Sequence, residues 1–350
     1  MIINQVKRLI AKERLRFFFY EIAIAFLLIF FLSTIEWISL PIKLNPIFGT
    51  IFYIIRALIV FLAIPAAIYF MEKLIPYEQD LRRKSKMSAF QSHFMLYKMT
   101  KSNYKYQLLY GILLLFLVFI PLNFFLYLLI PKMLTYLKFS EGSNSLNSYL
   151  LIGNFLIFLP FLILIQISIA FIEETIYRGF INKRGGEHFS PISAVSISAY
   201  SYAFLSLIFY LDPVSSYGYN FFPIIWFFAS FLIGLILSLT TIRRKWLFPS
   251  IFAHSMSNII MVSMIWCFNG TNYMDILLFF YIPLLIISII LFIWQFKRIK
   301  ESLAIGLGML KTYLKNDENE DEQTSDKYFR IFFDIVIGFL TFLIGLLITM

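Results

Sequence analysis

Two carboxylates and an arginine form the first group of residues whose types and spacing suit acid–base chemistry. Glu173 and Glu174 are adjacent, and Arg178 follows four positions after Glu174. On a helix, Glu174 and Arg178 share one face and can pair, whereas Glu173 points about 100° away from them. Two neighbouring carboxylates repel each other, so Glu173 is suited to accept a proton while Arg178 keeps Glu174 ionised.

A histidine and an asparagine form the second group. His254 and Asn258 are also four residues apart, so one helical face presents both hydrogen-bonding side chains. His254 lies nine residues after Lys245, and Glu174 lies nine residues before Lys183. At about 1.5 Å per residue, each motif is roughly 13 Å from a basic end of its helix. We therefore expect the two motifs to meet in one layer of the molecule.

Each group also has a purely structural interpretation. A glutamate pair near a helix end can extend its carboxylates to the membrane surface. A histidine in an apolar helix can bond a neighbouring backbone carbonyl. Two such groups at matched depth favour a functional site over either interpretation.

The composition shows to which class of protein these residues belong. Of the 350 residues, 60% are hydrophobic and 14% are charged, whereas a soluble domain has about 45–50% apolar and 25% charged residues. An ordinary soluble enzyme and an intrinsically disordered chain are therefore excluded. The single cysteine, Cys267, excludes a disulfide framework and a cysteine-ligated zinc or iron–sulfur site.

Long apolar stretches of roughly 18–25 residues are typical of helices that cross a bilayer. They predict an all-α fold, a polytopic transmembrane helical bundle of about eight or nine spans. The nine candidate spans are 17–40, 49–71, 108–130, 149–172, 191–211, 221–241, 247–266, 275–295 and 331–349.

The basic residues predict the orientation of these spans. Alternate loops hold 26 of the 30 lysines and arginines, and the opposite loops hold only Lys43, Lys132 and Lys138; Arg56 lies inside the second span. This distribution follows the positive-inside rule. It predicts a multi-pass protein of the plasma membrane with a cytoplasmic N-terminus. The net charge of +10 is thereby explained, so no nucleic acid partner is expected.

The chain divides into three predicted segments. Residues 1–148 hold the N-terminal spans with a basic cytoplasmic loop at 72–107, residues 149–266 hold both polar groups, and residues 267–350 hold the C-terminal spans with an amphipathic and acidic cytoplasmic segment at 297–330.

Both cytoplasmic segments show helical patterns. The loop carries Met87, Phe90, Phe94 and Tyr97 at helical spacing among basic residues, which predicts an interfacial amphipathic helix. Residues 299–315 carry a leucine stripe, and an acidic patch from Asp317 to Glu322 follows. A surface helix and a solvated linker is the simpler interpretation; a regulatory or partner site is the alternative.

The two polar groups resemble motifs of the CAAX protease and bacteriocin-processing family, called CPBP or Abi. Its members carry EExxxR, then FxxxH, then HxxxN. Glu173, Glu174 and Arg178 match the first motif, with Gly179-Phe180 after it, and His254 and Asn258 match the third. A helix of small and apolar residues at 227–239 also resembles the family. The resemblance covers about 150–262, which predicts a CPBP-like core at 149–266.

The resemblance implies an intramembrane endopeptidase that acts on a peptide or lipidated peptide at the cytoplasmic side of the membrane. It implies that Glu173 activates a water, assisted in the family by the histidine of the second motif, and that His254 and Asn258 stabilise the developing oxyanion. Glu174 and Arg178 would hold the geometry. The bilayer and the peptide substrate are the expected partners. No cofactor is expected: one histidine and two glutamates are a poor donor set for zinc, although a metal mechanism has also been assigned to the family.

The second motif departs from the family. Its best match is Phe204 to Ile208, so an isoleucine stands at the histidine position. His188 is a candidate to reach back over the site from a short loop; a solvated loop histidine is the simpler interpretation. The alternative function is therefore a catalytically degenerate member, acting as a membrane scaffold, a bacteriocin immunity protein or a regulator of a partner membrane protein. A transporter has less support, because no inverted halves are evident.

Overall fold

The computed structural model describes residues 2–39, 45–76, 79, 88–128, 133–135, 137–138, 145–210, 221–268, 273–315 and 323–349. Within these ranges the regular elements are all helices, with no strand. Nine helices among the described residues are long and apolar enough to cross a membrane. The predicted all-α, multi-pass helical bundle is confirmed.

The spans include several continuous rods that change helix type along their length. Short π-helical segments join α1 to α2, α6 to α7, α9 to α10 and α14 to α15, while a seven-residue helix, α5, lies between spans. The bounds are α1 (Ile2–Phe17), α2 (Ala23–Ser39), α3 (Pro46–Leu74), α5 (Ala89–Met95), α6 (Tyr104–Leu114), α7 (Ile120–Asn123), α9 (Phe155–Glu174), α10 (Lys183–His188), α11 (Pro191–Phe204), α12 (Phe222–Arg244), α13 (Phe248–Phe268), α14 (Tyr273–Asp275), α15 (Ile282–Lys315) and α16 (Thr324–Thr349).

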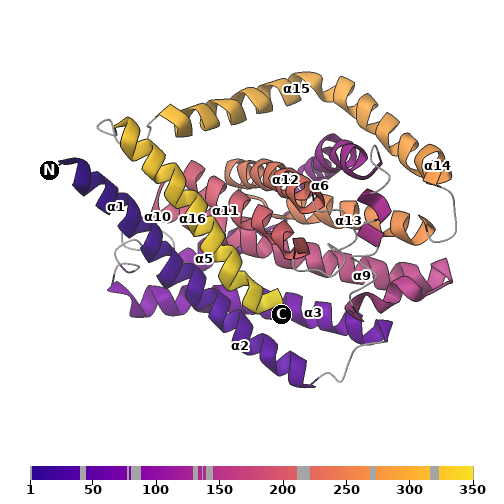
Figure 1. Cartoon of the computed structure of the whole chain (residues 1–350), viewed down its shortest axis with the longest axis horizontal. Helices are drawn as coiled ribbons and strands as arrows, with labels where there is room; N and C mark the ends of the chain where they lie inside the picture. The colour runs from indigo at the N-terminus through magenta and orange to yellow at the C-terminus, as the bar shows by residue number, and fades with distance from the viewer. Residues whose placement is uncertain are drawn as a thin grey trace.

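Helix α11 has neighbours on several sides, since it packs against α10, α12 and α16, while α9 packs against α3 and α13. The N-terminal α1 and the C-terminal α16 lie side by side, and α15 runs along the edge of the bundle (Figure 1). One hydrophobic cluster joins Phe17, Phe180 and Ile337, so it draws on all three predicted segments. The division at 148 and 266 remains a prediction.

Several spans extend beyond the apolar stretches that predicted them. The first begins at Gln5 rather than at 17, and the fourth continues to His188 rather than ending near 172. The fourth rod ends where Ser190 caps α11 and Pro191 occupies its first turn, as expected for a residue with no backbone N–H. Glu173 and Glu174 therefore lie in the middle of a continuous rod.

Helix α5 is docked against the rod that carries the glutamates. The Glu72 carboxylate of α3 accepts a hydrogen bond from the backbone N–H of Ala89 at 2.5 Å, which holds the start of α5. At its other end, the His93 Nδ1 lies 3.2 Å from the Gly179 carbonyl oxygen. Of the residues that predicted an interfacial helix, Phe90 and Phe94 lie on α5, and Met87 lies outside the described residues.

The segment predicted as a separate surface helix at 299–315 is the end of α15. Leu303, Leu307 and Leu314 are exposed, whereas Leu310 packs against the cluster that contains Tyr313. The acidic patch that follows lies outside the described residues.

Several basic residues that the sequence placed in cytoplasmic segments are buried in ionic networks. Arg14 of α1 is fully buried and lies 2.8 Å from the Asp334 carboxylate of α16 through its Nε. The Tyr313 hydroxyl donates to the other oxygen of Asp334 at 2.8 Å. This network fastens the two terminal helices to α15. Arg14 therefore stabilises the contacts between these helices.

His188 belongs to a second buried network, so the expectation of a solvated loop histidine is wrong. Its Nε2 lies 3.1 Å from a carboxylate oxygen of Glu21, and its ring packs against Phe17 at 5.2 Å. Arg184 also pairs with Glu21. The histidine is buried because the fourth rod extends through it and packs against α1 and the π-helical segment Phe18–Ile22.

The buried His93 predicts a loss of stability on acidification. Burial lowers the pKa of His93 to about 4, and the nearby Arg184 acts in the same direction. Because an unfolded histidine titrates near 6.5, this group contributes stability that is complete above about pH 6.5 and is lost as the pH falls toward 4. The full loss is about 3 kcal/mol.

The thermal unfolding midpoint of the detergent-solubilised protein, measured between pH 7 and pH 4.5, tests this expectation. His93→Gln retains an N–H donor for the Gly179 carbonyl but does not titrate. Its midpoint is expected to fall less with pH than that of the wild type. Equal slopes for the two proteins would contradict the assignment.

Candidate functional site

The rod that carries the glutamates is fixed locally by its own sequence. Asn154 caps α9 by accepting from the Leu156 backbone N–H at 2.9 Å. Directly after Glu174 the rod becomes a π-helix over Thr175–Asn182, a feature that occurs often at functional sites. Gly179 lies in this segment, and a Cβ there would come within 3.2 Å of the Leu247 side chain. The small residue thus lets the neighbouring chain approach the π-helical turn.

Glu174 and Arg178 form the pair that their spacing predicts. The Arg178 Nη1 donates to the Glu174 Oε1 at 3.0 Å, and both side chains are fully buried. The interpretation in which these carboxylates extend to the membrane surface is therefore wrong for Glu174. A buried carboxylate of this kind is stable only with a paired charge and hydrogen bonds.

His254 connects the two motifs. Its Nδ1 lies 2.9 Å from the Glu174 Oε1, and its Nε2 lies 3.6 Å from the Glu173 Oε2. Phe119 stacks on the imidazole at 5.7 Å with an interplanar angle of 20°. The histidine therefore bonds a carboxylate of the first motif rather than a backbone carbonyl. The matched depth predicted from the sequence does bring the two motifs together.

The hydrogen bonds define the role of each imidazole nitrogen. A nitrogen that faces an ionised carboxylate carries the hydrogen and donates it, so Nδ1 donates to Glu174. The Nε2 then faces Glu173 and donates as well when the ring is protonated. The Glu173 side chain is 28% exposed, whereas that of Glu174 is fully buried. Glu173 is therefore the more exposed carboxylate of this pair.

Tyr202 of α11 belongs to the same cluster, although the sequence analysis did not select it. Its ring meets the His254 ring edge-on at 6.2 Å, and the Arg178 guanidinium lies over its face at 4.4 Å. Its hydroxyl interacts electrostatically with the Glu173 carboxylate. The second motif was sought by its histidine, so a tyrosine was not considered. The feature that could have indicated Tyr202 is its position, two residues before the expected start of that motif.

The residues assigned to the second motif lie elsewhere. Phe204 packs against Phe227 and Phe339, on the side of α12 and α16. Ile208 lies beyond the end of α11, in the 3₁₀ segment Leu205–Tyr210, and is half-buried. Tyr202, two residues before Phe204, is the residue of α11 that faces the glutamates and His254.

Asn258 lies one turn after His254 on α13 and is half-buried. Within the described part of the chain its amide makes no hydrogen bond to the cluster. The adjacent Ser257 accepts a hydrogen bond from the Asn123 amide at 3.0 Å, which fixes the rotation of α13 about its axis.

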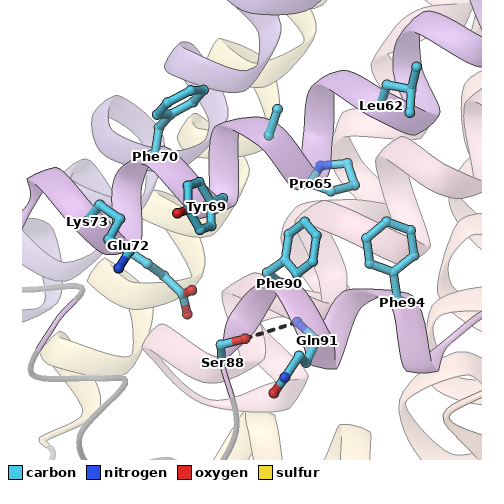
Figure 2. Close-up of a pocket in the computed structure, with 11 residues that line it drawn as sticks. Leu62, Pro65, Tyr69, Phe70, Glu72, Lys73, Ser88, Phe90, Gln91 and Phe94 are labelled. Carbon is cyan, nitrogen blue, oxygen red and sulfur yellow. Dashed lines mark hydrogen bonds between the residues drawn. The ribbon is translucent and has the colours of Figure 1, made fainter.

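A cavity of about 640 Å³ lies between α3 and α5. Figure 2 shows Glu72, Lys73 and Ser88 at one end of it and Leu62 and Phe94 at the other. Most of the wall is apolar or aromatic. The cavity therefore has the character of a site for a hydrocarbon chain with a polar group at one end.

Aromatic contacts connect this cavity to the glutamate-bearing rod. Phe94 on the cavity wall meets Phe61 at 5.7 Å, and Phe61 meets Phe171 at 5.8 Å, two residues before Glu173. The Tyr97 hydroxyl donates to the Thr175 hydroxyl at 3.0 Å, one residue after Glu174. Ring contacts therefore connect the cavity wall with the rod that carries Glu173.

Among the described residues, no group of three or more histidines, cysteines, aspartates and glutamates is arranged to hold a metal ion. The expectation that no cofactor takes part stays a prediction.

One comparison with known proteins found a family to which the middle of the chain is similar. Neither curated proteins nor solved structures gave a significant match to the chain. The family model described as Rce1-like, "Type II CAAX prenyl endopeptidase Rce1-like", matches residues 155–260, the segment that contains Glu173, Tyr202 and His254. The resemblance to the CPBP family is thus confirmed: over residues 155–260, the chain is similar to the Rce1-like type II CAAX prenyl endopeptidases.

Proposed function

We propose that the protein is a membrane endopeptidase in which Glu173 activates the attacking water. One observation carries the proposal: His254 lies between the buried, arginine-paired Glu174 and the partly exposed Glu173. In serine proteases a buried carboxylate orients a histidine in the same way. The match to the type II CAAX prenyl endopeptidases supports peptide hydrolysis as the reaction.

The proposed reaction uses one water and one peptide bond. Glu173 takes a proton from the water, and the oxygen adds to the carbonyl carbon to form a tetrahedral intermediate. The carbon–nitrogen bond then breaks, and the proton held by Glu173 passes to the departing amine. The products are a new carboxylate and a new amine, with Glu173 ionised again.

His254 and Asn258 are the proposed donors to the oxyanion. The protonated His254 ring donates from Nδ1 to Glu174 and offers its Nε2–H beside Glu173, and Asn258 supplies an amide from the next turn. Donors that are fixed in a site of low dielectric stabilise such an intermediate by several kcal/mol. Arg178 contributes indirectly, since it holds the Glu174 carboxylate that orients the imidazole.

A lipidated peptide is the proposed substrate. The cavity between α3 and α5 offers an apolar wall for a lipid chain and Lys73 near one end. Ring contacts connect it with the rod that carries Glu173. Peptides that lack a lipid are expected to bind more weakly, because they leave the cavity unfilled.

The proposed site acts from the cytoplasmic side of a plasma membrane, with the N-terminus in the cytoplasm. The distribution of 26 of the 30 basic residues supports this orientation. The bilayer supplies the lipidated substrate from its cytoplasmic leaflet.

The experiment is cleavage of a prenylated peptide with a C-terminal CAAX sequence by the purified protein in lipid nanodiscs. Mass spectrometry is expected to show one cleaved bond and slower cleavage of the unprenylated peptide. No cleavage of either peptide, or of any peptide in a library of lipidated sequences, would overturn the proposal.

Filling the cavity tests its role. Ala66→Trp places a large ring among the residues that line the cavity, and it is expected to raise KM for the prenylated peptide about tenfold while leaving kcat/KM for the plain peptide unchanged. Leu58→Trp is the matched control, because Leu58 is an exposed residue of α3 outside the cavity. An equal effect of both variants would contradict the assignment of the cavity.

A scaffold, immunity protein or regulator of a partner membrane protein is the second candidate. The isoleucine at the expected second-motif histidine favours it. In this case Glu173→Gln would leave the cellular phenotype intact, and changes on the surface that contacts the partner would abolish it.

A further inference from the structure

We propose that Tyr202 is a positioning residue for Glu173 and serves in place of the imidazole that the second motif lacks. The inference rests on the proposed function, because it concerns the orientation of the proposed base. Tyr202 packs against Arg178 and His254, and its hydroxyl interacts electrostatically with the Glu173 carboxylate. It is therefore placed to donate to one carboxylate oxygen while the Glu173 Oε2 faces the His254 Nε2 at 3.6 Å.

Three contacts fix the Tyr202 ring and therefore the direction of its hydroxyl. The Arg178 guanidinium lies 4.4 Å from the ring centre, the Tyr177 ring lies 5.3 Å away, and the His254 ring lies 6.2 Å away at nearly a right angle. The first two contacts come from the π-helical segment Thr175–Asn182, directly after Glu174, and the third comes from α13. The ring thus joins α11 to both motifs.

The phenol hydroxyl of a tyrosine is a suitable donor to the Glu173 carboxylate. Its O–H is a donor at any pH at which the enzyme works, because the ordinary phenol titrates near 10. A donor to an ionised carboxylate favours the ionised form, in which Glu173 can accept a proton from water. A histidine at a second motif would act on the same carboxylate. The missing histidine therefore does not leave Glu173 without a donor from α11.

Tyr202→Phe isolates the hydroxyl, because the phenylalanine ring retains the contacts with Arg178 and His254. A lost hydrogen bond to a charged group predicts a fall in kcat of roughly 10- to 100-fold. KM for the prenylated peptide is expected to stay the same, since the cavity between α3 and α5 is unchanged. The acidic limb of the kcat/KM profile is expected to move to higher pH.

Tyr200→Phe is the matched control. Tyr200 lies on the same helix, but its ring packs against Phe231 at 4.7 Å and therefore faces α12. Its loss of a hydroxyl is expected to leave kcat, KM and the pH profile at wild-type values. The unfolding midpoints of both variants are measured with the kinetics, so a loss of folding is separated from a loss of positioning.

The rate of the double variant Tyr202→Phe with Glu173→Gln shows whether the losses of the two single variants add. A residue with a merely structural role would give additive losses. If Tyr202 acts through Glu173, its loss adds nothing once Glu173 is gone. Additive losses would overturn the inference. So would a Tyr202→Phe variant with wild-type kcat and pH profile.

A different result would contradict the proposed function itself. If Glu173→Gln cleaves the prenylated peptide at the wild-type rate, then Glu173 is not the base and the proposed function is wrong. If Glu173→Gln is inactive and Tyr202→Phe is unaffected, the proposed function stands and only the role of Tyr202 is wrong.

Discussion

Replacing Glu173 with glutamine is expected to lower kcat/KM for a prenylated CAAX peptide by at least about 10²–10⁴-fold. The glutamine amide has nearly the same shape as the carboxylate, but it cannot take a proton from water. The fold is expected to survive, because the Glu173 side chain is partly exposed and the buried pair of Glu174 and Arg178 is untouched. Rates are measured with purified protein in nanodiscs.

Glu187→Gln is the matched control for this variant. Glu187 lies 14 residues further along the same rod and pairs with Lys183 at 2.6 Å, with 27% of its side chain exposed. The chemical change is identical, yet the rate is expected to stay near that of the wild type. A comparable loss in both variants would point to a general effect on the rod rather than to a catalytic base.

The second large effect is expected on stability. Arg178→Met leaves the Glu174 carboxylate fully buried without its guanidinium, and breaking a buried ion pair in this way costs about 3–5 kcal/mol. The unfolding midpoint in detergent is therefore expected to fall markedly. Lys183→Met, which breaks the partly exposed pair with Glu187, is expected to cost less than about 1 kcal/mol.

Removing both charges shows whether the unpaired carboxylate or lost packing explains the lower stability of Arg178→Met. Glu174→Gln combined with Arg178→Met no longer buries an unpaired carboxylate, so the double variant is expected to regain much of the lost stability. It is still expected to be inactive, because His254 loses the carboxylate that orients it. A double variant as unstable as Arg178→Met alone would show that packing, rather than charge, explains the loss.

The apolar runs were enough to predict the helical bundle, because a bilayer requires long apolar helices. The four-residue spacing was enough to predict the pair of Glu174 and Arg178, because it depends only on helix geometry. Matched depth also brought His254 near that pair. These predictions rest on distances along one helix or on depth in the membrane.

The predictions that failed depended on the ends of helices and on contacts between distant segments. The fourth rod extends to His188, and this extension buries Arg184 and His188 against Glu21. The contact spans more than 160 positions, and no local pattern encodes it. Tyr202 was missed for a related reason: which residue of α11 faces the glutamates depends on the rotation of that helix in the bundle.

The origin of the new carboxylate oxygen tests the central claim most directly. The purified protein cleaves a prenylated CAAX peptide in water enriched in ¹⁸O, and the products are weighed by mass spectrometry. We expect a single cleaved bond with one ¹⁸O atom in the new carboxylate for the wild type and for Glu187→Gln, and at least about 100-fold less product for Glu173→Gln at the same enzyme concentration and time. Equal labelled product from Glu173→Gln, or no product from the wild type, would contradict Glu173-activated hydrolysis.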